Sequence, residues 1–462
     1  DQPRSRGLGD VYKRQVVVYC GCVGILPKKK YFRRVKPGDM IVLAGGKTGR
    51  DGLHGVTFAS AELTEESEKT SRQAVQIPNP VEEEKLRRAI LRIRDEELGS
   101  GITDLGGGGI SCAVCEMAHR FNCGASVHLE RVHLKEEGMA PWEIWISESQ
   151  ERMLIAVPRK NLARVLEIFE EEEVEAVPIG EFDESRIVKV YFHGVPVGEI
   201  DLDFLFKPPQ AERMAIWKPP ETYEPTFDEP GDLEVILTKL LSTPNIASKE
   251  AIIRTYDHEV RGCTVLKPLQ GDKGGPNDGV ILKPVPRSWK GIVISCGIKP
   301  RYGKISPYWM AASSIEEAIR NNSAVGGRRI ALLDNFTWGN PERPDRMGSL
   351  LEAVRACYDF AKSFETPFIS GKDSLYNESP LGPVTPTLLI TAVGIIPDIR
   401  KAISVDVKRP GDLIYVIGET LPELGGSEYY ALMGFLGSSV PKVNARTSRK
   451  IISSLIKAID LG

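Results

Sequence analysis

The stretch VVVYCGCVGILPKKKYFRRVKPGDMIVLAG, residues 16–45, returns near the other end of the chain as LLITAVGIIPDIRKAISVDVKRPGDLIYVIG, residues 388–418. Two blocks carry the match: VGILP matches VGIIP, and KPGD matches RPGD. The copies lie about 370 residues apart, whereas solenoid repeats have periods of roughly 20 to 50 residues. The repeat therefore predicts a duplicated module of two domains, in which a strand follows Gly38 and again Gly411.

The repeat and the composition together predict the order of domains in a mixed α+β fold. Six prolines between residues 207 and 231, with little apolar periodicity, indicate a linker. The first copy starts where the second is already ending one domain, so the chain is expected to be an internal fragment. The predicted order is a non-native leader at 1–15, the end of an N-terminal-type domain at 16–37, a C-terminal-type domain at 38–206, the linker at 207–231, a second N-terminal-type domain at 232–402 and a truncated second C-terminal-type domain at 408–462.

The composition excludes several classes of protein. With 60 Lys and Arg against 63 Asp and Glu among 462 residues, and with no basic stripe interleaved with aromatic residues, binding to nucleic acid or to a membrane surface has no electrostatic support. The longest apolar runs fall well short of the roughly 18 residues of a membrane span. Eight scattered cysteines indicate reduced thiols rather than a disulfide framework. A cytoplasmic enzyme is the expectation.

Local signals predict a helix that starts at Asn79. Asparagine is a favoured N-cap, Pro80 suits the first helical position, and Gly99 is expected to end the helix. Apolar residues recur at helical spacing and predict the buried stripe Leu86, Ala89, Ile90 and Ile93.

A short strand then leads to an acidic residue and a glycine-rich loop. Asp104 ends the run Ile102–Asp104, four glycines follow at 106–109, and a further helix begins. Glycines allow a backbone to approach phosphate closely, and a carboxylate at that place can bind Mg²⁺. The alternative is a turn in which Asp104 caps the next helix, and the motif alone does not decide between them.

Three consecutive polar residues, Glu148, Ser149 and Gln150, lie between an expected helix at 142–146 and an expected strand at 153–157. Their carboxylate, hydroxyl and amide groups suit a substrate rich in amide and hydroxyl groups. An ordinary polar turn is the alternative.

Two further strands are expected to end in polar residues. One is the run 330–336, which contains Asp334, and the other is the run 368–374, which passes into the small polar loop Ser370-Gly371-Lys372-Asp373-Ser374. Two such loops at one sheet edge could bind Mg²⁺ and a triphosphate through Asp, Lys and backbone N–H groups. Each loop alone could equally be structural, but their joint occurrence favours a nucleotide site.

A set of motifs in this chain resembles phosphoribosylformylglycinamidine synthase, in the form whose synthetase subunit works with separate glutaminase and small accessory subunits. The motifs are GGKTGRDGLHGVTFAS (45–60), VQIPNP (75–80), ITDLGGGGIS (102–111), ISESQERML (146–154), YDHEVRG (256–262), LLDNFTWGNPE (332–342) and SGKDSLYNE (370–378). The resemblance covers residues 16–462. It implies tandem half-modules of the aminoimidazole ribonucleotide synthetase-like superfamily, which agrees with the internal repeat.

The resemblance implies ATP-dependent conversion of formylglycinamide ribonucleotide and ammonia to the amidine, with Mg²⁺ as cofactor. It also assigns roles by motif: Gln76, Glu148, Ser149, Gln150 and Ser374 to the substrate, Asp334 and Gly371 to ATP, and Asp104 to Mg²⁺. Many relatives have a metal-binding asparagine where this chain has Lys372, a cation that cannot bind metal. Lys372 is therefore expected to contact phosphate, and Asp373 to serve as the metal ligand.

The resemblance also implies that ammonia comes from a partner protein. Cys22, His128 and Glu130 imitate a glutaminase set, but Cys22 and His128 read as strand residues and the set is rejected. The family's catalytic histidine is expected upstream of residue 16, so residues 16–462 alone are expected to be inactive. Other ATP-dependent enzymes of the superfamily, and a non-catalytic nucleotide-binding scaffold, remain as alternatives.

Overall fold

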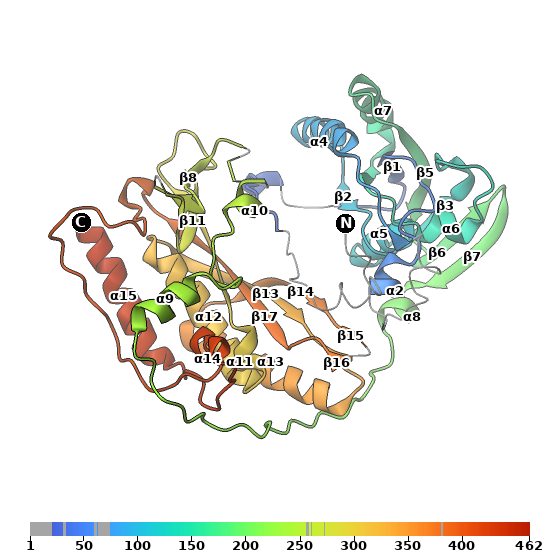
Figure 1. Cartoon of the computed structure of the whole chain (residues 1–462). Helices are drawn as coiled ribbons and strands as arrows, with labels where there is room; N and C mark the ends of the chain where they lie inside the picture. The colour runs from blue at the N-terminus through green and yellow to red at the C-terminus, as the bar shows by residue number, and fades with distance from the viewer. Residues whose placement is uncertain are drawn as a thin grey trace, which may run out of the picture. The chain divides into compact units, whose positions relative to one another are not determined.

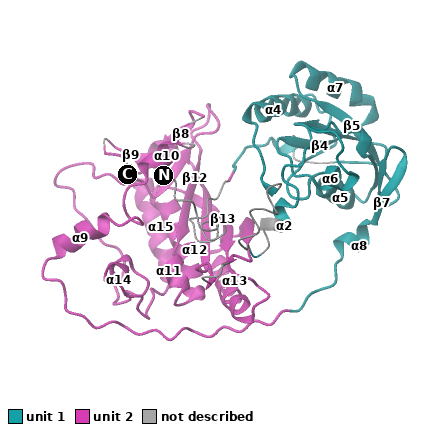
Figure 2. Ribbon diagram, turned by 45° about the vertical axis from the view of Figure 1, so that its right-hand side comes forward, with its two compact units in different colours: residues 1–9, 22–212 teal, residues 10–21, 213–462 magenta. Residues whose placement is uncertain are grey.

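The computed structural model describes residues 21–30, 34–59, 62, 74–255, 258–259, 261–271, 273–379 and 382–462. The predicted leader, part of the predicted domain end at 16–37 and parts of the motifs at 45–60 and 256–262 lie outside these residues. The described residues form two compact units, 22–212 and 213–462 (Figure 2). Their boundary falls inside the proline-rich segment that the sequence marks as a linker.

Unit 1 is built on a seven-stranded sheet in the order β2-β4-β1-β5-β3-β6-β7 (Figure 1). Its strands are β1 (Met40–Gly45), β2 (Gly101–Asp104), β3 (Gly124–His128), β4 (Arg152–Val157), β5 (Ala176–Asp183), β6 (Ile187–Phe192) and β7 (Val195–Asp201). The predicted strand after Gly38 is therefore β1, which pairs antiparallel with both β4 and β5.

Helices cover both faces of this sheet, which explains why every residue of β1 is buried. Ile41 and Leu43 belong to the core that includes α5 (Gly109–Arg120), whereas Val42 belongs to the core beneath α4 (Pro80–Asp95) and α7 (Leu162–Glu171). The described part of the unit also contains the shorter α-helices α2 (Gly55–Ala59), α6 (Pro141–Ile146) and α8 (Leu202–Phe206).

The capping signals of α4 act as the sequence predicts at the start of the helix but not at its end. Asn79 accepts a hydrogen bond from the Glu82 amide at 3.3 Å, and Pro80 is the first helical residue. The helix ends at Asp95, earlier than a stop at Gly99 implies. Glu97 has a φ of 56° and so takes the left-handed conformation that was expected of glycine.

Unit 2 contains a six-stranded sheet in the order β14-β13-β17-β12-β11-β8 (Figure 1). These strands are β8 (Thr264–Leu266), β11 (Gly279–Leu282), β12 (Gly291–Ile298), β13 (Arg328–Thr337), β14 (Phe368–Ser374) and β17 (Thr387–Ile396). Two small pairs lie outside the sheet: β9 (Leu269–Gln270) with β10 (Gly275–Pro276), and β15 (Glu378–Ser379) with β16 (Gly382–Pro383).

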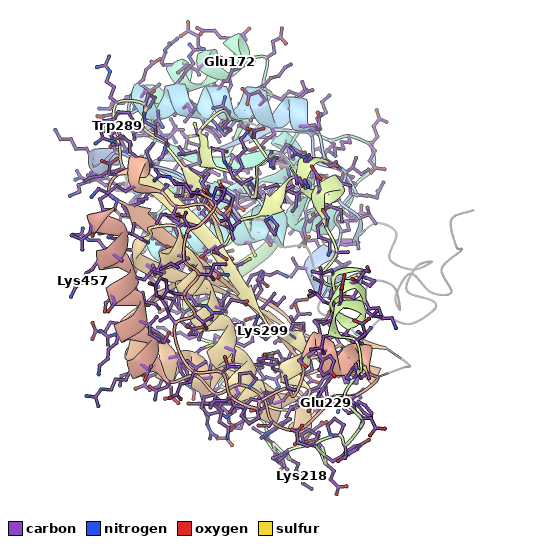
Figure 3. All side chains as sticks on the ribbon, turned by 60° about the vertical axis from the view of Figure 1, so that its left-hand side comes forward. Glu172, Lys218, Glu229, Trp289, Lys299 and Lys457 are labelled. Atoms are coloured by element: carbon purple, nitrogen blue, oxygen red, sulfur yellow. The ribbon has the colours of Figure 1, made fainter. Side chains whose placement is uncertain are left out.

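The main helices of unit 2 are α12 (Pro307–Ala324), α13 (Pro344–Phe364) and α15 (Ala445–Leu461), which share one apolar core with β13 and β17. Ile452 of α15 faces that core, whereas Lys457 projects from the outer side of the helix (Figure 3). The remaining helices are α9 (Leu233–Leu241), α10 (Glu250–Thr255), α11 (Pro300–Gly303) and α14 (Glu428–Leu432). Among the described residues, no helix is long and apolar enough to cross a membrane.

The proline-rich segment has no regular secondary structure, yet it is fixed to unit 2 from Ile216 onward. The Ile216 amide donates to the Pro344 carbonyl at 2.8 Å. Glycine at 348 permits this approach, because a Cβ there would lie 2.2 Å from the Ile216 carbonyl carbon. Glu224 then accepts hydrogen bonds from the amides of Ser438 and Ser439 at 2.9 and 2.6 Å.

The two copies of the repeat share their turn but not their strand. The amides of Asp39 and Asp412 each donate to the residue three positions earlier, at 3.0 and 3.2 Å, and both preceding glycines have positive φ. However, the strand predicted after Gly411 does not form, and Ile414 is 88% exposed whereas Ile41 is fully buried. β1 has strands on both sides, and residues 408–462 as described contain no such partners.

Candidate functional site

The turn between α6 and β4 joins segments of unit 1 that are distant in sequence. Glu148 is only 2% exposed. One carboxylate oxygen accepts hydrogen bonds from the amides of Val56 and Gly108, each at 3.2 Å, and the other accepts from the Gln76 side-chain amide at 3.2 Å. The structure therefore brings Gln76 and Glu148 together with the glycine-rich loop.

Ser149 is fully buried and bonded to the loop that follows β1. Its hydroxyl accepts from the Gly49 amide at 2.9 Å and donates to Asp51 at 2.8 Å. Asp51 is held in turn by Lys135, whose ammonium group lies 2.9 Å from one carboxylate oxygen. Gln150 donates its side-chain amide to the Glu148 carbonyl at 2.7 Å.

Sequence reasoning missed three residues of this network. Asp51 lies inside the quoted motif GGKTGRDG, but its partner Lys135 is 84 positions away and no local pattern connects them. Arg152, at the start of β4, is buried directly against the Ser147–Gln150 turn. The proximity of Arg152 to the turn could have been noticed, because the motif ISESQERML contains it.

Asp104 stands at the end of β2 with an exposed side chain. It is not the cap of the next helix: the residue before α5 is Gly108, and no side chain caps that end. The Asp104 carboxylate makes no hydrogen bond or ion pair within the described part of the chain. Of the two interpretations that the sequence allowed, the N-capping turn is therefore wrong for Asp104.

The glycine-rich loop passes too close to the polar turn for a larger residue. Gly109 has a φ of 55°, and a Cβ on it would lie 1.9 Å from the Ser147 carbonyl oxygen. Gly108 also has positive φ, at 76°. The loop therefore needs glycine both for its conformation and for the close approach.

In unit 2 the register of β13 and β14 sorts the predicted nucleotide residues onto two faces. Asp334 pairs with Gly371, and Phe336 pairs with Asp373. β14 continues as a strand to Ser374, where the sequence suggested a loop. Because side chains alternate along a strand, Asp334 and Asp373 share one face, and Lys372 and Ser374 lie on the other.

The surroundings of Asp334 disfavour its charged form. Burial raises the pKa of Asp334, and the charge of Asp373 raises that pKa further. Gly371 leaves room for the Asp334 carboxylate, because a Cβ on Gly371 would lie 2.3 Å from one of its oxygens. Lys372 is exposed on edge strand β14, and the Ser374 hydroxyl lies 3.3 Å from the side-chain amide of Asn377.

These acidic residues fit a magnesium ion better than a tightly bound metal. No group of three or more His, Cys, Asp or Glu side chains capable of holding a metal occurs among the described residues. Mg²⁺, however, is commonly held by one or two carboxylates together with water and substrate phosphates. Asp104, whose carboxylate has no partner among the described residues, and the neighbouring residues Asp334 and Asp373 offer carboxylates of that kind, and a cation would offset the burial and the nearby charge that raise the Asp334 pKa.

Two family models match the chain: "AIR synthase related protein, C-terminal domain" over residues 36–193, and "AIR synthase related protein, N-terminal domain" over residues 276–396. Together they cover more than half of the chain, which therefore belongs to the AIR synthase related proteins. The matched ranges fall within unit 1 and within unit 2.

Among curated proteins, the chain is similar to phosphoribosylformylglycinamidine synthase subunit PurL. It is 40% identical to that of Picrophilus torridus over 428 residues, which are 91% of this chain and 57% of the relative. It is 38% identical to that of Thermococcus sibiricus over 451 residues, which are 96% of this chain and 61% of the relative. The resemblance indicated by the sequence motifs is thus confirmed, and the chain spans somewhat more than half the length of these relatives.

Solved structures agree. Thermotoga maritima PurL complexed with FGAR matches with a TM-score of 0.65 and 29% identity, covering 80% of this chain and 57% of that one. The same protein complexed with ATP matches with a TM-score of 0.61 and 27% identity, over 80% of this chain and 55% of that one. PurLQS from Thermotoga maritima gives a TM-score of 0.64 and 26% identity, over 82% and 58%.

Proposed function

We propose that this protein takes part in the ATP-dependent conversion of formylglycinamide ribonucleotide (FGAR) and ammonia to formylglycinamidine ribonucleotide, with release of ADP and phosphate. The similarity to PurL proteins over 91% and 96% of the chain carries the proposal. Structures of a relative complexed with FGAR and with ATP support the two small-molecule substrates. In the proposed reaction the amide oxygen accepts the γ-phosphoryl group of ATP, and ammonia then displaces that oxygen as phosphate.

In unit 1 we assign substrate binding to the turn that carries Glu148, Ser149 and Gln150, and to Gln76. The side chains of Glu148 and Ser149 are buried and hydrogen-bonded within the protein. Gln150 and Gln76 are more exposed, so their amides are the groups of this set best placed to reach a ligand. Asp104 would hold Mg²⁺ beside the glycine-rich loop.

In unit 2 we assign Asp334 and Gly371 to the nucleotide, Asp373 to Mg²⁺, and Lys372 to a phosphate group. Ser374 is assigned to the substrate. Mg²⁺ bound to these carboxylates would neutralise charge on the phosphoryl group during transfer. Lys372 and Asp373 lie on opposite faces of β14. These two residues would therefore contact different chemical groups of the bound nucleotide and its metal, and not the same group.

We also propose that a separate glutaminase and a small accessory subunit supply the ammonia, in the cytoplasm. The prediction that Cys22 is a strand residue is wrong, because it lies in an exposed segment without regular structure. His128 is the last residue of β3, as predicted for a strand residue, and it stacks on Tyr191 and pairs with Glu130 at 3.3 Å. PurLQS from Thermotoga maritima, one of the structural relatives, supports a multi-subunit assembly.

The proposal is tested in two steps. First, calorimetry measures binding of FGAR and of ADP to this chain. Second, the chain is completed at both ends with the flanking segments of the Picrophilus torridus relative, and ADP release is followed. We expect release to require both FGAR and ammonia, and glutamine to replace ammonia only when a glutaminase and an accessory subunit are added.

Two results would contradict the proposal. ADP binding without any FGAR binding or ADP release would favour the nucleotide-binding scaffold. Use of glutamine by the completed protein without partners would instead revive Cys22, His128 and Glu130 as a glutaminase set.

A further inference from the structure

Arg152 is a buried cation with no hydrogen-bonded carboxylate among the residues that the structure describes. It begins β4 opposite Gly45 of β1, and the residue is only 3% exposed. Burial lowers the pKa of its guanidinium group to about 10, so the group stays charged at neutral pH. Because a buried charge is costly unless its hydrogen bonds are satisfied, the partners of Arg152 indicate what it does.

Those partners belong to two of the segments that form the candidate site. The guanidinium group donates to the carbonyl oxygens of Ser149 at 2.7 Å and Ser147 at 2.6 Å. It also donates to the Thr48 hydroxyl at 2.8 Å. One planar group thus binds the backbone on both sides of Glu148 and the loop that follows β1.

The contacts leave the turn little freedom. Glu151 has a φ of 54°, an uncommon conformation for a residue with a side chain. The Gly46 amide donates to the Glu151 carbonyl at 2.9 Å, and a Cβ on Gly45 would lie 2.1 Å from the same oxygen. The loop and the turn are therefore fitted together, and Arg152 binds both of them.

We infer that Arg152 is a positioning residue, which fixes the Ser147–Gln150 turn so that Glu148 can hold the glycine-rich loop and Gln76. The inference rests on the proposed binding of FGAR at this turn. Arginine is required because its rigid fork reaches three acceptors at once, whereas an ammonium group is a compact point charge on a flexible stem. Arg152 itself is placed behind the turn and not in contact with the substrate.

The main test compares Arg152→Lys and Arg152→Met with the control Arg159→Met. In the wild type, the exposed guanidinium group of Arg159 pairs with Glu181 on the surface of the same unit. FGAR affinity is measured by calorimetry at a temperature where every variant is folded. We expect both Arg152 variants to bind FGAR about tenfold more weakly or worse, since hydrogen bonds from charged groups are among the stronger ones in proteins. Arg159→Met should bind like the wild type.

Hydrogen exchange gives a second readout that needs no ligand. In Arg152→Lys the amides of Gly46 and Gly49, which donate to Glu151 and Ser149, should exchange about tenfold faster. The amides of β13 in unit 2 should be unchanged. If Arg152 variants fail to fold, Thr48→Val provides the same test with the charge intact, and Thr48→Ser should restore both exchange and affinity.

The outcomes separate this inference from the proposed function. Wild-type exchange at Gly46 and Gly49 in both Arg152→Lys and Thr48→Val would overturn the positioning role. So would wild-type FGAR affinity in both variants. A wild-type chain that fails to bind FGAR, while exchange still rises in the variants, would instead contradict the proposed function and leave Arg152 as the residue that orders the turn.

Discussion

At the scale of single residues, burial decides how a polar side chain can act. Glu148 and Ser149 carry the carboxylate and hydroxyl groups expected of a substrate site, yet both are buried and bonded to the protein's own amides and to Asp51. Asp104 is the opposite case, because its carboxylate is exposed and has no hydrogen-bond or ion-pair partner among the described residues. The free group is therefore the better candidate for direct contact with a ligand or metal.

The first prediction concerns that carboxylate. Asp104→Asn should weaken binding of Mn²⁺, used as a probe for Mg²⁺ in the presence of ATP and FGAR, by about tenfold, which corresponds to roughly 1.4 kcal/mol. Magnesium sites of this type use only one or two carboxylates, so losing one matters. Water-proton relaxation measures the affinity, with Asp95→Asn as a matched control on the surface of the same unit. Equal Mn²⁺ affinity in both variants would show that Asp104 is only a turn residue.

The second prediction concerns the pH dependence of unit 2. Burial and the nearby Asp373 raise the pKa of Asp334 in the folded protein. The folded state therefore loses stability, relative to the unfolded chain, as the pH rises from the ordinary Asp pKa through the raised one. Asp334→Asn cannot ionise, so its melting temperature relative to the wild type should increase across that window.

Thermal unfolding between pH 3 and pH 7 measures this effect. Asp278→Asn, at an exposed position in the same unit, is the control. Its melting temperature relative to the wild type should not increase with pH across this window. A constant difference for Asp334→Asn across the pH range would mean that Asp334 does not carry a raised pKa.

At the scale of elements, the junction between the glycine-rich loop and α5 is fixed by close contact with the turn before β4. Gly109 combines a φ of 55° with a space that a Cβ would share with the Ser147 carbonyl, the same carbonyl that accepts from Arg152. The glycine-rich loop, the start of α5 and the turn are therefore packed directly against one another. A change at the loop should reach the Arg152 contacts directly.

The third prediction compares Gly109→Ala with Gly138→Ala. Gly138 also has positive φ, at 74°, but a Cβ there would meet nothing within 4 Å. Left-handed backbone costs a residue with a side chain about 1 to 2 kcal/mol, and this applies to both variants. Gly109→Ala should lose roughly 1 to 3 kcal/mol more, because the Ser147 carbonyl must move.

Urea unfolding of unit 1 measures the two free energies, and calorimetry measures FGAR affinity. We expect Gly138→Ala to bind FGAR normally and Gly109→Ala to bind it more weakly. If the two variants were equally stable, the close contact at Gly109 would have no energetic importance.

At the scale of the whole molecule, two units with their own sheets and apolar cores are joined by a segment whose two halves differ. Residues 208–212 are exposed, and their backbone makes no hydrogen bond among the described residues. From Ile216 onward the segment is bonded to unit 2, and Glu224 accepts from Ser438 and Ser439. The flexible part of the predicted linker is therefore expected to be its beginning alone.

The fourth prediction follows from this difference. Brief digestion with a glutamate-specific protease should cut after Glu212 well before it cuts after Glu221, which lies between the docked residues Ile216 and Glu224, because cleavage requires exposed and mobile backbone. Mass spectrometry identifies the fragments, and circular dichroism should show that each still unfolds cooperatively. Faster cutting after Glu221 than after Glu212 would contradict the docking of the segment on unit 2.

Local sequence determined much of this protein by itself. The Asn79 cap, the buried stripe of α4 and the strands that carry Asp104 and Asp334 follow from signals within a few residues, because capping and side-chain periodicity are local properties. The internal repeat and the motif set also indicated the family correctly. The proximity of Gln76, Glu148 and the glycine-rich loop came from the structure, and their roles in a site stay a prediction.

Only the tertiary structure decided the features that depend on distant partners. The residues after Gly411 repeat the pattern of β1 but stay exposed, since a strand needs neighbours to satisfy its backbone and bury its side chains. The register of β13 and β14 separated Lys372 from Asp373. Arg152 gained its role from carbonyl oxygens that the fold brings to it, and the pairing of Asp51 with Lys135 spans 84 residues. Such contacts are set by how the whole chain packs, and no short pattern encodes them.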